Sequence, residues 1–361
     1  MEDINGIALA LSVTRNVVPG DWARLTATPA EIWEMLQSPS GLSNLGACLG
    51  HDVGPVAWGA FDEQRKRAER CSARVLSRWD AAYPWRLRLV ASPPPLLFVR
   101  GAASLFELPA FAIVGTRAPS SAGVAFTTRL ARDLATRGVV VVSGMARGID
   151  TAAHRGALDA AAPTIAVLGT GVDVAYPPEN TGLMERIIAS GIVVSEQWCG
   201  TIAAPHVFPR RNRIISGVSE GVVVVEGGVK SGALITARCA LEQGRDVGAV
   251  PGFPGDFRSA GPNGLIKDGA FVVESAGDVI ANVPNLIPRR MDSTPPVGVV
   301  VTTDCLDDAS RRVYDLLGRD ADVDDVARAS GLDAGRVQEI LSRLEIEGLV
   351  VRAESGRFAR A

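Results

Sequence analysis

The chain has 361 residues, with 37 basic and 40 acidic side chains and a formal net charge of -3. This length is enough for two or three domains, and such a charge does not by itself indicate a nucleic-acid partner. Five scattered cysteines without a closely spaced pair indicate reduced thiols rather than a metal site. The sequence contains neither a membrane-spanning apolar run nor a signal-peptide pattern. We therefore expect a soluble, cytoplasmic protein without a membrane partner.

Residues 1–85 are predicted to form a helical domain. Thr28, Pro29 and Glu31 have the spacing of a helix start, with Thr28 as the cap and Pro29 at the first helical position. The segment 62–79 is charged and lacks proline and glycine, which predicts a surface helix. Prolines at positions 93–95 end any helix, and residues 96–99 are predicted to be extended.

Residues 86–283 are predicted to form a Rossmann-like α/β domain, with a parallel sheet and helices on both of its faces. Short runs rich in β-branched residues are separated by helix-length segments, as is typical of parallel strands that are buried on both sides. Each run ends in glycine or a small polar residue, and this edge of an open α/β sheet is where ligands bind. The runs are 111–114, 139–143, 164–168, 192–195, 222–225 and 247–250.

The remaining residues are predicted to form a linker and a small carboxy-terminal domain. Residues 284–305 contain four prolines, which predicts the linker. Residues 306–361 are predicted to form a winged-helix domain. Its helices are expected at 310–317, 323–330 and 334–347, and a hairpin is expected from 348–351 and 356–358. A three-helix interaction module would share most of this pattern.

The loop after the first predicted strand of the α/β domain has the features of an anion site. Gly115 allows a sharp turn, and Ser120 or Ser121 can cap the following helix, whose amino-terminal amides attract anions. Arg117, after Thr116, offers a planar fork for phosphate. Taken alone, the same residues are also consistent with an ordinary turn and a solvated arginine.

The loop after the second strand brackets Arg147 between Gly144 and Gly148. Asp150 is predicted to cap the next helix, and His154 lies one helical turn further on. The two side chains could pair as a catalytic dyad, but no serine or cysteine nucleophile has suitable spacing. A helix cap with a packed histidine is the favoured interpretation.

Two further cationic segments, at 208–216 and 225–236, also follow predicted strands. The first contains three arginines just before an apolar helix start, and the second places Lys230 and Ser231 at a helix amino terminus after two glycines. The alternative explanation of the first segment is a solvated run of charges, and that of the second is a glycine turn that allows close packing.

Together these loops predict a basic edge on a nearly neutral domain, as expected for a partner with a phosphate backbone. No carboxylate pair, metal-ligand cluster or activated nucleophile accompanies them, so we predict no catalytic residue, metal or cofactor. The candidate DNA-binding residues are Gly115, Thr116, Arg117, Ser120, Gly144, Arg147, Gly148, Arg210, Arg211, Asn212, Arg213, Lys230 and Ser231.

In combination, the segments resemble the DNA-processing protein A (DprA/Smf) family over about residues 80–280. The resemblance is carried by AIVGTRAPSSAG, VVVVSGMARGIDTAAHRGAL, TIAVLGTGVDVAYPPEN, FPRRNRIISG, VVVEGGVKSGALITARCALEQGRDVGAVPG and GLIKDGA. It implies a protein that binds single-stranded DNA, forms a homodimer and helps to load the RecA recombinase during natural transformation. It also implies that Arg117 contacts phosphate, with Thr116 in place of the commoner serine. The chain departs from the family's usual pattern at two places. Ala91 and Ser92 replace the usual acidic residue before the prolines, and Gly227 replaces the usual alanine after Glu226. Neither departure removes a cation.

Two other functions are alternatives. The fold resembles that of nucleotide-ribose hydrolases of the lonely-guy type, but the position of their catalytic glutamate is taken here by Leu234, which cannot assist glycosidic cleavage. A regulator that binds duplex DNA through the winged helix is the second alternative. That domain is only mildly basic and contains many acidic residues.

Overall fold

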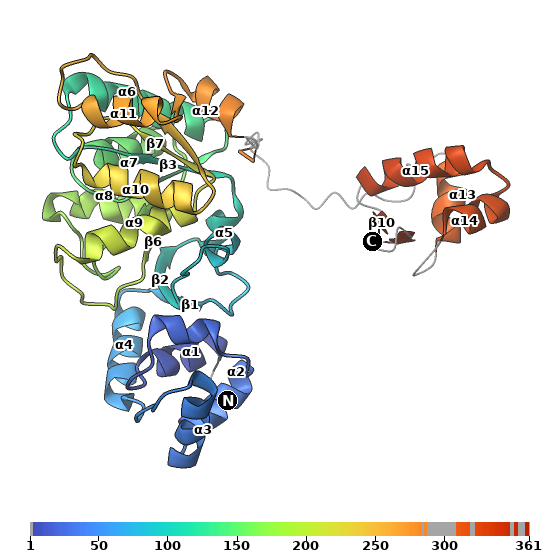
Figure 1. Ribbon diagram of the computed structural model, residues 1–361, viewed down its shortest axis with the longest axis horizontal. Helices are drawn as coiled ribbons and strands as arrows, with labels where there is room; N and C mark the ends of the chain where they lie inside the picture. Colours follow the sequence, from blue (N-terminus) through green and yellow to red (C-terminus); the bar gives the residue numbers. More distant parts are fainter. Residues whose placement is uncertain are drawn as a thin grey trace. The chain divides into compact units, whose positions relative to one another are not determined.

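The computed structural model describes residues 3–283, 285–286, 308–317, 322–346, 350–352 and 358–360. The chain divides into two compact units, Met1–Met291 and Asp292–Ala361 (Figure 1). Apart from residues 285 and 286, the predicted linker lies outside the described residues, and so do residues 348, 349, 356 and 357 of the predicted hairpin. Among the described residues, no helix combines the length and the apolar composition needed to cross a bilayer.

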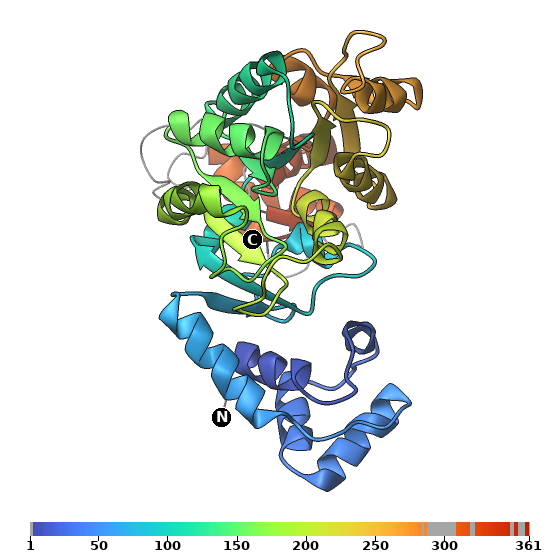
Figure 2. The ribbon, with the colours of Figure 1, turned by 90° about the vertical axis from the view of Figure 1, so that its left-hand side faces the viewer.

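The first unit begins with a group of helices that pack against one end of a sheet (Figure 2). Thr28 caps α2 as predicted: its hydroxyl accepts a hydrogen bond from the Glu31 amide, and the Glu31 carboxylate accepts one from the Thr28 N–H at 2.7 Å. The elements are α1 (Ile4–Ser12), η1 (Pro19–Ala23), α2 (Pro29–Leu36), α3 (Pro39–Leu49) and α4 (Trp58–Arg70).

The predicted helix over residues 62–79 is wrong in its second half. Helix α4 ends at Arg70, Ser72 adopts a left-handed backbone with φ of 54°, and strand β1 (Arg74–Ser77) follows. This strand pairs antiparallel with β2 (Leu96–Gly101), the segment that was predicted to be extended. Pairing with a later strand therefore decides the conformation of a segment that contains no local helix breaker.

Within the described residues, a nine-stranded sheet has the order β1-β2-β6-β5-β4-β3-β7-β8-β9. The pairs from β3 to β9 are parallel, whereas β2 pairs antiparallel with both β1 and β6. The bounds of the six strand runs predicted for the α/β domain lie within one residue of the observed ones, and the predicted fold class is confirmed. The strands are β3 (Ala110–Val114), β4 (Val140–Ser143), β5 (Thr164–Val167), β6 (Ile192–Ser195), β7 (Gly221–Val224), β8 (Asp246–Ala249) and β9 (Phe271–Val272).

Helices cover both faces of the sheet, as predicted (Figure 2). Alternate residues of a strand face opposite sides: Ala112 and Val114 join a core with α9 and α10, whereas Phe111 and Ile113 join a core with α6 and α7. The elements between and after the strands are α5 (Trp85–Arg88), η2 (Ala103–Glu107), α6 (Ser121–Ala135), α7 (Ile149–Asp159), η3 (Pro178–Asn180), α8 (Thr181–Ser190), α9 (Val207–Gly217), α10 (Gly232–Glu242), α11 (Ala260–Lys267) and α12 (Ala276–Asn282).

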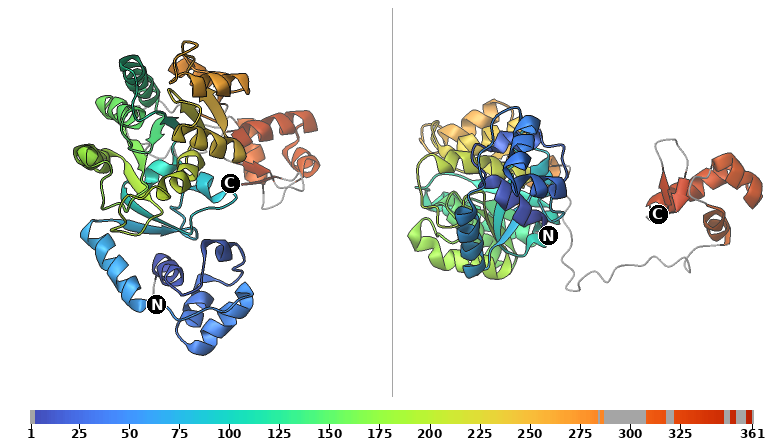
Figure 3. Two further views of the ribbon diagram at one scale, coloured as in Figure 1. Left: turned by 60° about the vertical axis from the view of Figure 1, so that its left-hand side comes forward. Right: turned by 90° about the horizontal axis from the view of Figure 1, so that it is seen from below.

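The strand order reverses beside β3. Strands β3 to β6 follow one another in one direction across the sheet, and the chain then returns to place β7 on the other side of β3 (Figure 3). The loops after β3 and β7 therefore lead to helices on opposite faces and leave a crevice at the carboxyl edge. Open α/β sheets bind their ligands at such a reversal.

The second unit has the predicted winged-helix order. It contains α13 (Asp308–Leu316), α14 (Val323–Ser330), α15 (Ala334–Ile346) and the antiparallel strands β10 (Val350–Arg352) and β11 (Phe358–Arg360). Val313, Val326, Leu341 and Phe358 are buried in a core of its own. This core explains why the three helices and the hairpin pack together.

Candidate nucleic-acid interface

A cleft of about 680 Å³ lies at the carboxyl edge of the sheet, where the strand order reverses. A smaller adjoining cavity shares Arg117 and Arg211 with it and adds Gly144 and Arg147. The predicted residues that line the cleft are Gly115, Thr116, Arg117, Arg211, Asn212 and Ser231. The predicted residues that line neither cavity are Ser120, Gly148, Arg210, Arg213 and Lys230.

A carboxylate of the protein itself occupies the amino terminus of α6. Ser120 caps this helix, as one of the two predicted options, and its hydroxyl accepts a hydrogen bond from the Gly123 amide at 2.9 Å. The Glu226 carboxylate accepts hydrogen bonds from both the amide and the hydroxyl of Ser120. The amino terminus of α6 therefore already holds one carboxylate of the protein, and an external phosphate at Ser120 would have to compete with Glu226.

The loop after β3 is fixed in place while Arg117 remains exposed. The Thr116 amide donates to the Glu226 carbonyl at 2.7 Å, and the Thr116 carbonyl accepts from the Ile149 amide at 3.2 Å. A Cβ on Gly148 would come within 2.4 Å of the Thr116 carbonyl oxygen, so the position requires glycine. The Arg117 guanidinium lies 5.3 Å from the centre of the Phe208 ring, at the wall of the cleft.

Asp150 lies under the loop after β4 and does not cap α7, contrary to the prediction. The N-cap is Gly148, and the buried Asp150 carboxylate accepts hydrogen bonds from the amides of Gly144 at 3.1 Å and Ala146 at 3.4 Å. Burial raises the pKa of Asp150, and the charge of nearby Arg211 opposes this rise. The carboxyl group thus holds the turn from below.

His154 is a packed core residue and forms no dyad with Asp150. Its Nδ1 lies 2.8 Å from the hydroxyl of Thr164, and the side chain is fully buried. Burial, reinforced by the charge of Arg211, lowers the pKa of His154 to about 3. The ring is therefore neutral at physiological pH, and the favoured interpretation of this histidine is confirmed.

The three arginines at 210, 211 and 213 lie on helix α9, not in a strand-end loop as predicted. Arg211 is buried beneath the cleft, where its Nη1 donates to the carbonyls of Gly144, at 2.7 Å, and Val167. Burial lowers the pKa of Arg211 to about 10, so the side chain remains a cation at neutral pH. Asn212 donates to the Gly232 carbonyl at 3.2 Å and joins α9 to the start of α10.

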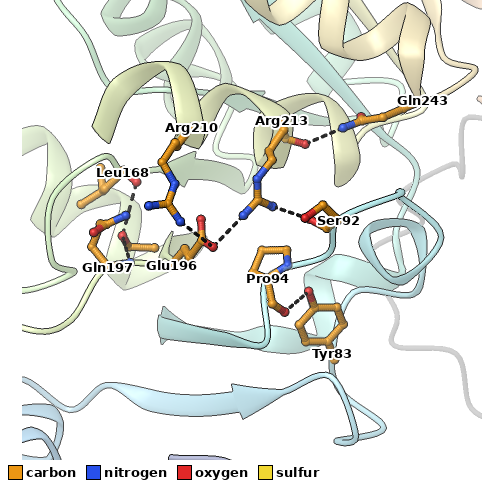
Figure 4. Close-up of polar contacts among 10 residues, drawn as sticks. Tyr83, Ser92, Pro94, Leu168, Glu196, Gln197, Arg210, Arg213 and Gln243 are labelled. Atoms are coloured by element: carbon orange, nitrogen blue, oxygen red, sulfur yellow. Dashed lines mark hydrogen bonds and ion pairs between the residues drawn. The ribbon is translucent and has the colours of Figure 1, made fainter. Parts of the chain in front are cut away.

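Arg210 and Arg213 converge on Glu196 (Figure 4). Arg213 lies 2.6 Å from the Glu196 carboxylate and also donates to the Ser92 carbonyl at 2.9 Å. Arg210 is exposed and lies 3.8 Å from the same carboxylate oxygen. These ion pairs hold both side chains outside the cleft.

The remaining predicted cations differ in their pairing. Arg147 is exposed but forms a two-pronged ion pair with Glu179, with its Nη2 at 3.1 Å. Lys230 is exposed beside Ser231, and Ser231 caps α10 as predicted through the Ala233 amide at 3.3 Å. Leu234, at the position of the hydrolase glutamate, packs against the core.

Sequence reasoning missed the carboxylate partners of three predicted site residues. Glu226, Glu179 and Glu196 lie far from Ser120, Arg147 and Arg213 in the sequence, so no local spacing pointed to them. The sequence pattern indicates no role for Phe208, yet its ring lies 5.3 Å from that of Tyr176 at the cleft. Within the described ranges, no three His, Cys, Asp or Glu side chains gather in a way that could hold a metal ion.

Comparisons with known proteins agree with this architecture. The family model for DNA recombination-mediator protein A matches residues 74–284, and the DprA winged helix domain matches residues 301–356. DNA processing protein DprA of Streptococcus pneumoniae is 45% identical over 240 residues, which are 66% of this chain and 85% of that protein. Protein Smf of Escherichia coli K12 is 38% identical over 286 residues, 77% of this chain and 76% of that protein.

Two solved structures are similar as well. The X-ray structure of DprA from S. pneumoniae matches with a TM-score of 0.65 and 33% identity, over 78% of this chain and 99% of that one. DNA processing protein A from Helicobacter pylori, whose structure is described as revealing a single-stranded DNA binding mode, matches with a TM-score of 0.53 and 29% identity, over 58% of this chain and 94% of that one. Neither the family's description nor these names specify a catalysed reaction. Because the family model covers more than half of its length, the chain belongs to the DNA processing protein A (DprA/Smf) family.

Proposed function

We propose that the protein binds single-stranded DNA in the cleft at the carboxyl edge of its sheet. The observation that carries this proposal is that an exposed arginine and a helix amino terminus line the same cleft: Arg117 after β3 and Ser231 at the start of α10. A helix amino terminus presents free amides and a positive dipole end, both of which favour phosphate. The H. pylori relative with a described single-stranded DNA binding mode supports this proposal.

The cations near the cleft are expected to contribute unequally. Arg117 is exposed and stacks on an aromatic ring, which leaves its fork of N–H donors available to a phosphate. A phosphate at Arg147 must instead replace Glu179, and one at Arg210 must compete with Glu196. Arg211 is largely buried in the floor of the cleft, where its charge makes the electrostatic potential of the cleft more favourable for a phosphate.

The size of the cleft favours a single strand over a duplex. A volume of about 680 Å³ is that of a small-molecule pocket and suits one or a few nucleotides. A flexible single strand can direct one phosphate into such a pocket and turn its bases outward. A duplex holds its phosphates on a rigid surface and cannot enter.

The test is a fluorescence anisotropy titration of labelled oligothymidylate and of a duplex of equal length, without added nucleotide or metal. We expect tighter binding to the single strand, and a fall in affinity as salt rises. Equal affinity for the duplex, or binding only in the presence of ATP, would contradict the proposal.

We further propose that the protein acts as a homodimer that helps a RecA-type recombinase to assemble on the bound strand. The family's description as a recombination mediator supports this role. Light scattering of the purified protein should give twice the mass of one chain. The rate at which purified RecA forms filaments on a single strand should rise when the protein is added, and an unchanged rate would refute the recombinase role.

A further inference from the structure

The loop between β8 and α11, residues 250–259, carries two exposed aromatic side chains. Phe253 exposes 81% of its surface and Phe257 exposes 64%. Because β8 lies parallel to β7, this loop leaves the sheet at the same edge as the loop that contains Lys230. Neither phenylalanine belongs to the residues that sequence analysis assigned to DNA binding.

The loop is bonded directly to both of the candidate phosphate-binding loops. The Gly227 amide donates to the Arg258 carbonyl at 2.6 Å, and the Gly261 amide donates to the Gly227 carbonyl at 2.8 Å. On the other side, Arg258 Nε donates to the Ala118 carbonyl at 3.2 Å, one residue after Arg117. The phenylalanines are therefore carried beside the segments that line the cleft.

The base of this loop is held in one conformation. The Gly252 amide donates to the Asn263 side-chain oxygen at 3.0 Å, and the Asn263 amide group donates back to the Gly252 carbonyl at 2.9 Å. Within the loop, the Asp256 amide donates to the Phe253 carbonyl at 3.2 Å. A partner that binds the two rings therefore loses little free energy in ordering the backbone.

Two cations lie near these rings, and one of them, Arg258, also pairs with Asp256 of the same loop at 3.7 Å. The Arg258 guanidinium lies 4.6 Å from the centre of the Phe257 ring, and the exposed Lys230 lies on the neighbouring glycine loop. A purely apolar partner would have to cover these cations, whereas a nucleic-acid strand offers flat bases for the rings and phosphates for the charges.

We propose that Phe253 and Phe257 stack on nucleobases of a single strand whose phosphates lie in the cleft. This inference rests on the function proposed above and extends the binding site from the cleft along the loop after β8. We call the two rings the stacking platform. Stacking on phenyl rings discriminates little between bases, so this platform adds affinity with little sequence preference.

The test combines Phe253→Ala and Phe257→Ala with a strand that contains 2-aminopurine, whose fluorescence is quenched by stacking. Each substitution should weaken binding about fivefold or more, as expected for the loss of one base–aromatic stack, and should reduce the quenching. Phe253→Trp should retain both the wild-type affinity and the wild-type quenching. On a strand with abasic sites in place of bases, wild type and the alanine variants should bind equally.

Leu241→Ala is the matched control, since this apolar side chain is 60% exposed and lies about 7.5 Å along α10 beyond Thr236, the last residue of that helix that lines the cleft. Unchanged affinity and quenching for both phenylalanine variants, in a protein that Arg117→Ala still weakens, would overturn the platform alone. Failure of the wild type to bind any single strand would overturn the proposed function itself. A change of mass in light scattering without a change in DNA affinity would show that the rings contact a second copy of the chain, and would also overturn the platform.

Discussion

Replacing Arg117 by alanine tests the cleft most directly, because this exposed arginine lies on the cleft wall and its loop is fixed from both sides. We expect Arg117→Ala to weaken binding to single strands of every sequence alike, since a phosphate contact carries no base information. The loss should correspond to one charge-assisted hydrogen-bonded contact, about 1.5–3 kcal/mol. The slope of log affinity against log salt should shrink by about 0.7.

Stability should change little in the same variant. The substitution removes the contact with the Phe208 ring, which is worth about 0.5–1 kcal/mol at an exposed site. For a unit of this size, such a loss lowers the melting temperature by no more than about 2–4 °C. A large fall in melting temperature would indicate that the arginine holds the loop, and lost binding would then say nothing about phosphate contact.

The assay is an anisotropy titration at several salt concentrations, with Arg137→Ala as the control. Arg137 is exposed like Arg117, but it lies just before β4, at the opposite edge of the sheet. The control should keep the wild-type affinity and slope. An unchanged slope for Arg117→Ala, in a protein that melts normally, would refute the assignment of this loop to the binding site.

Three further results are expected from the structure. Arg211→Met should lower the free energy of unfolding by about 3–5 kcal/mol, because it removes a buried cation near Asp150 and leaves the Gly144 and Val167 carbonyls without their donor. A denaturant titration measures the loss, and a change within about 0.5 kcal/mol, as is usual for a surface substitution, would contradict the expectation. Burial lowers the pKa of His154 from 6.5 to about 3, so below pH ~6.5 the unfolded chain binds a proton that the folded chain does not, and stability falls as pH drops toward 3 by up to about 1.4 kcal/mol per pH unit. His154→Asn should make this dependence shallower in denaturant titrations at a series of pH values, and parallel curves would argue against it. A chain that ends at residue 286 should keep the single-strand affinity of the full chain, since all residues that line the cleft lie between Val114 and Thr236; a folded but non-binding truncation would place the DNA site in the winged helix.

The parallel part of the fold could be predicted from the sequence because its signals are local. Runs such as 192–195 are short, rich in β-branched residues and bounded by turns, and each became a strand with nearly the predicted bounds. Strand β1 could not be predicted in this way, because the residues that make it a strand belong to β2. Nothing within residues 71–79 breaks a helix pattern except the left-handed Ser72, whose conformation the sequence does not reveal.

The candidate site could be predicted only in its loops. Successive residues on a helix are separated by about 100°, so Arg211 points to the floor of the cleft, whereas Arg210 and Arg213, three residues apart, lie on one side and converge on Glu196. The sequence presents all three as one cluster. The anion at the start of α6 is Glu226, 106 residues from Ser120, and no spacing rule connects the two. The exposure of Phe253 and Phe257 could not be predicted from the sequence either, because apolar residues that follow a strand are usually assigned to the core.

The helices at the start of the chain and the sheet share one core and one edge strand. Strand β1 belongs to the sheet, and residues of α1 and α4 are buried together with Leu96 and Phe98 of β2 and Leu168 after β5. In hydrogen exchange, these segments should therefore open as a single cooperative unit, with similar protection on both sides of the connection. A force that pulls on the amino-terminal helices would therefore strain the sheet itself. A partner that binds and displaces these helices would likewise displace strands β1 and β2, because no hinge separates the helices from the sheet.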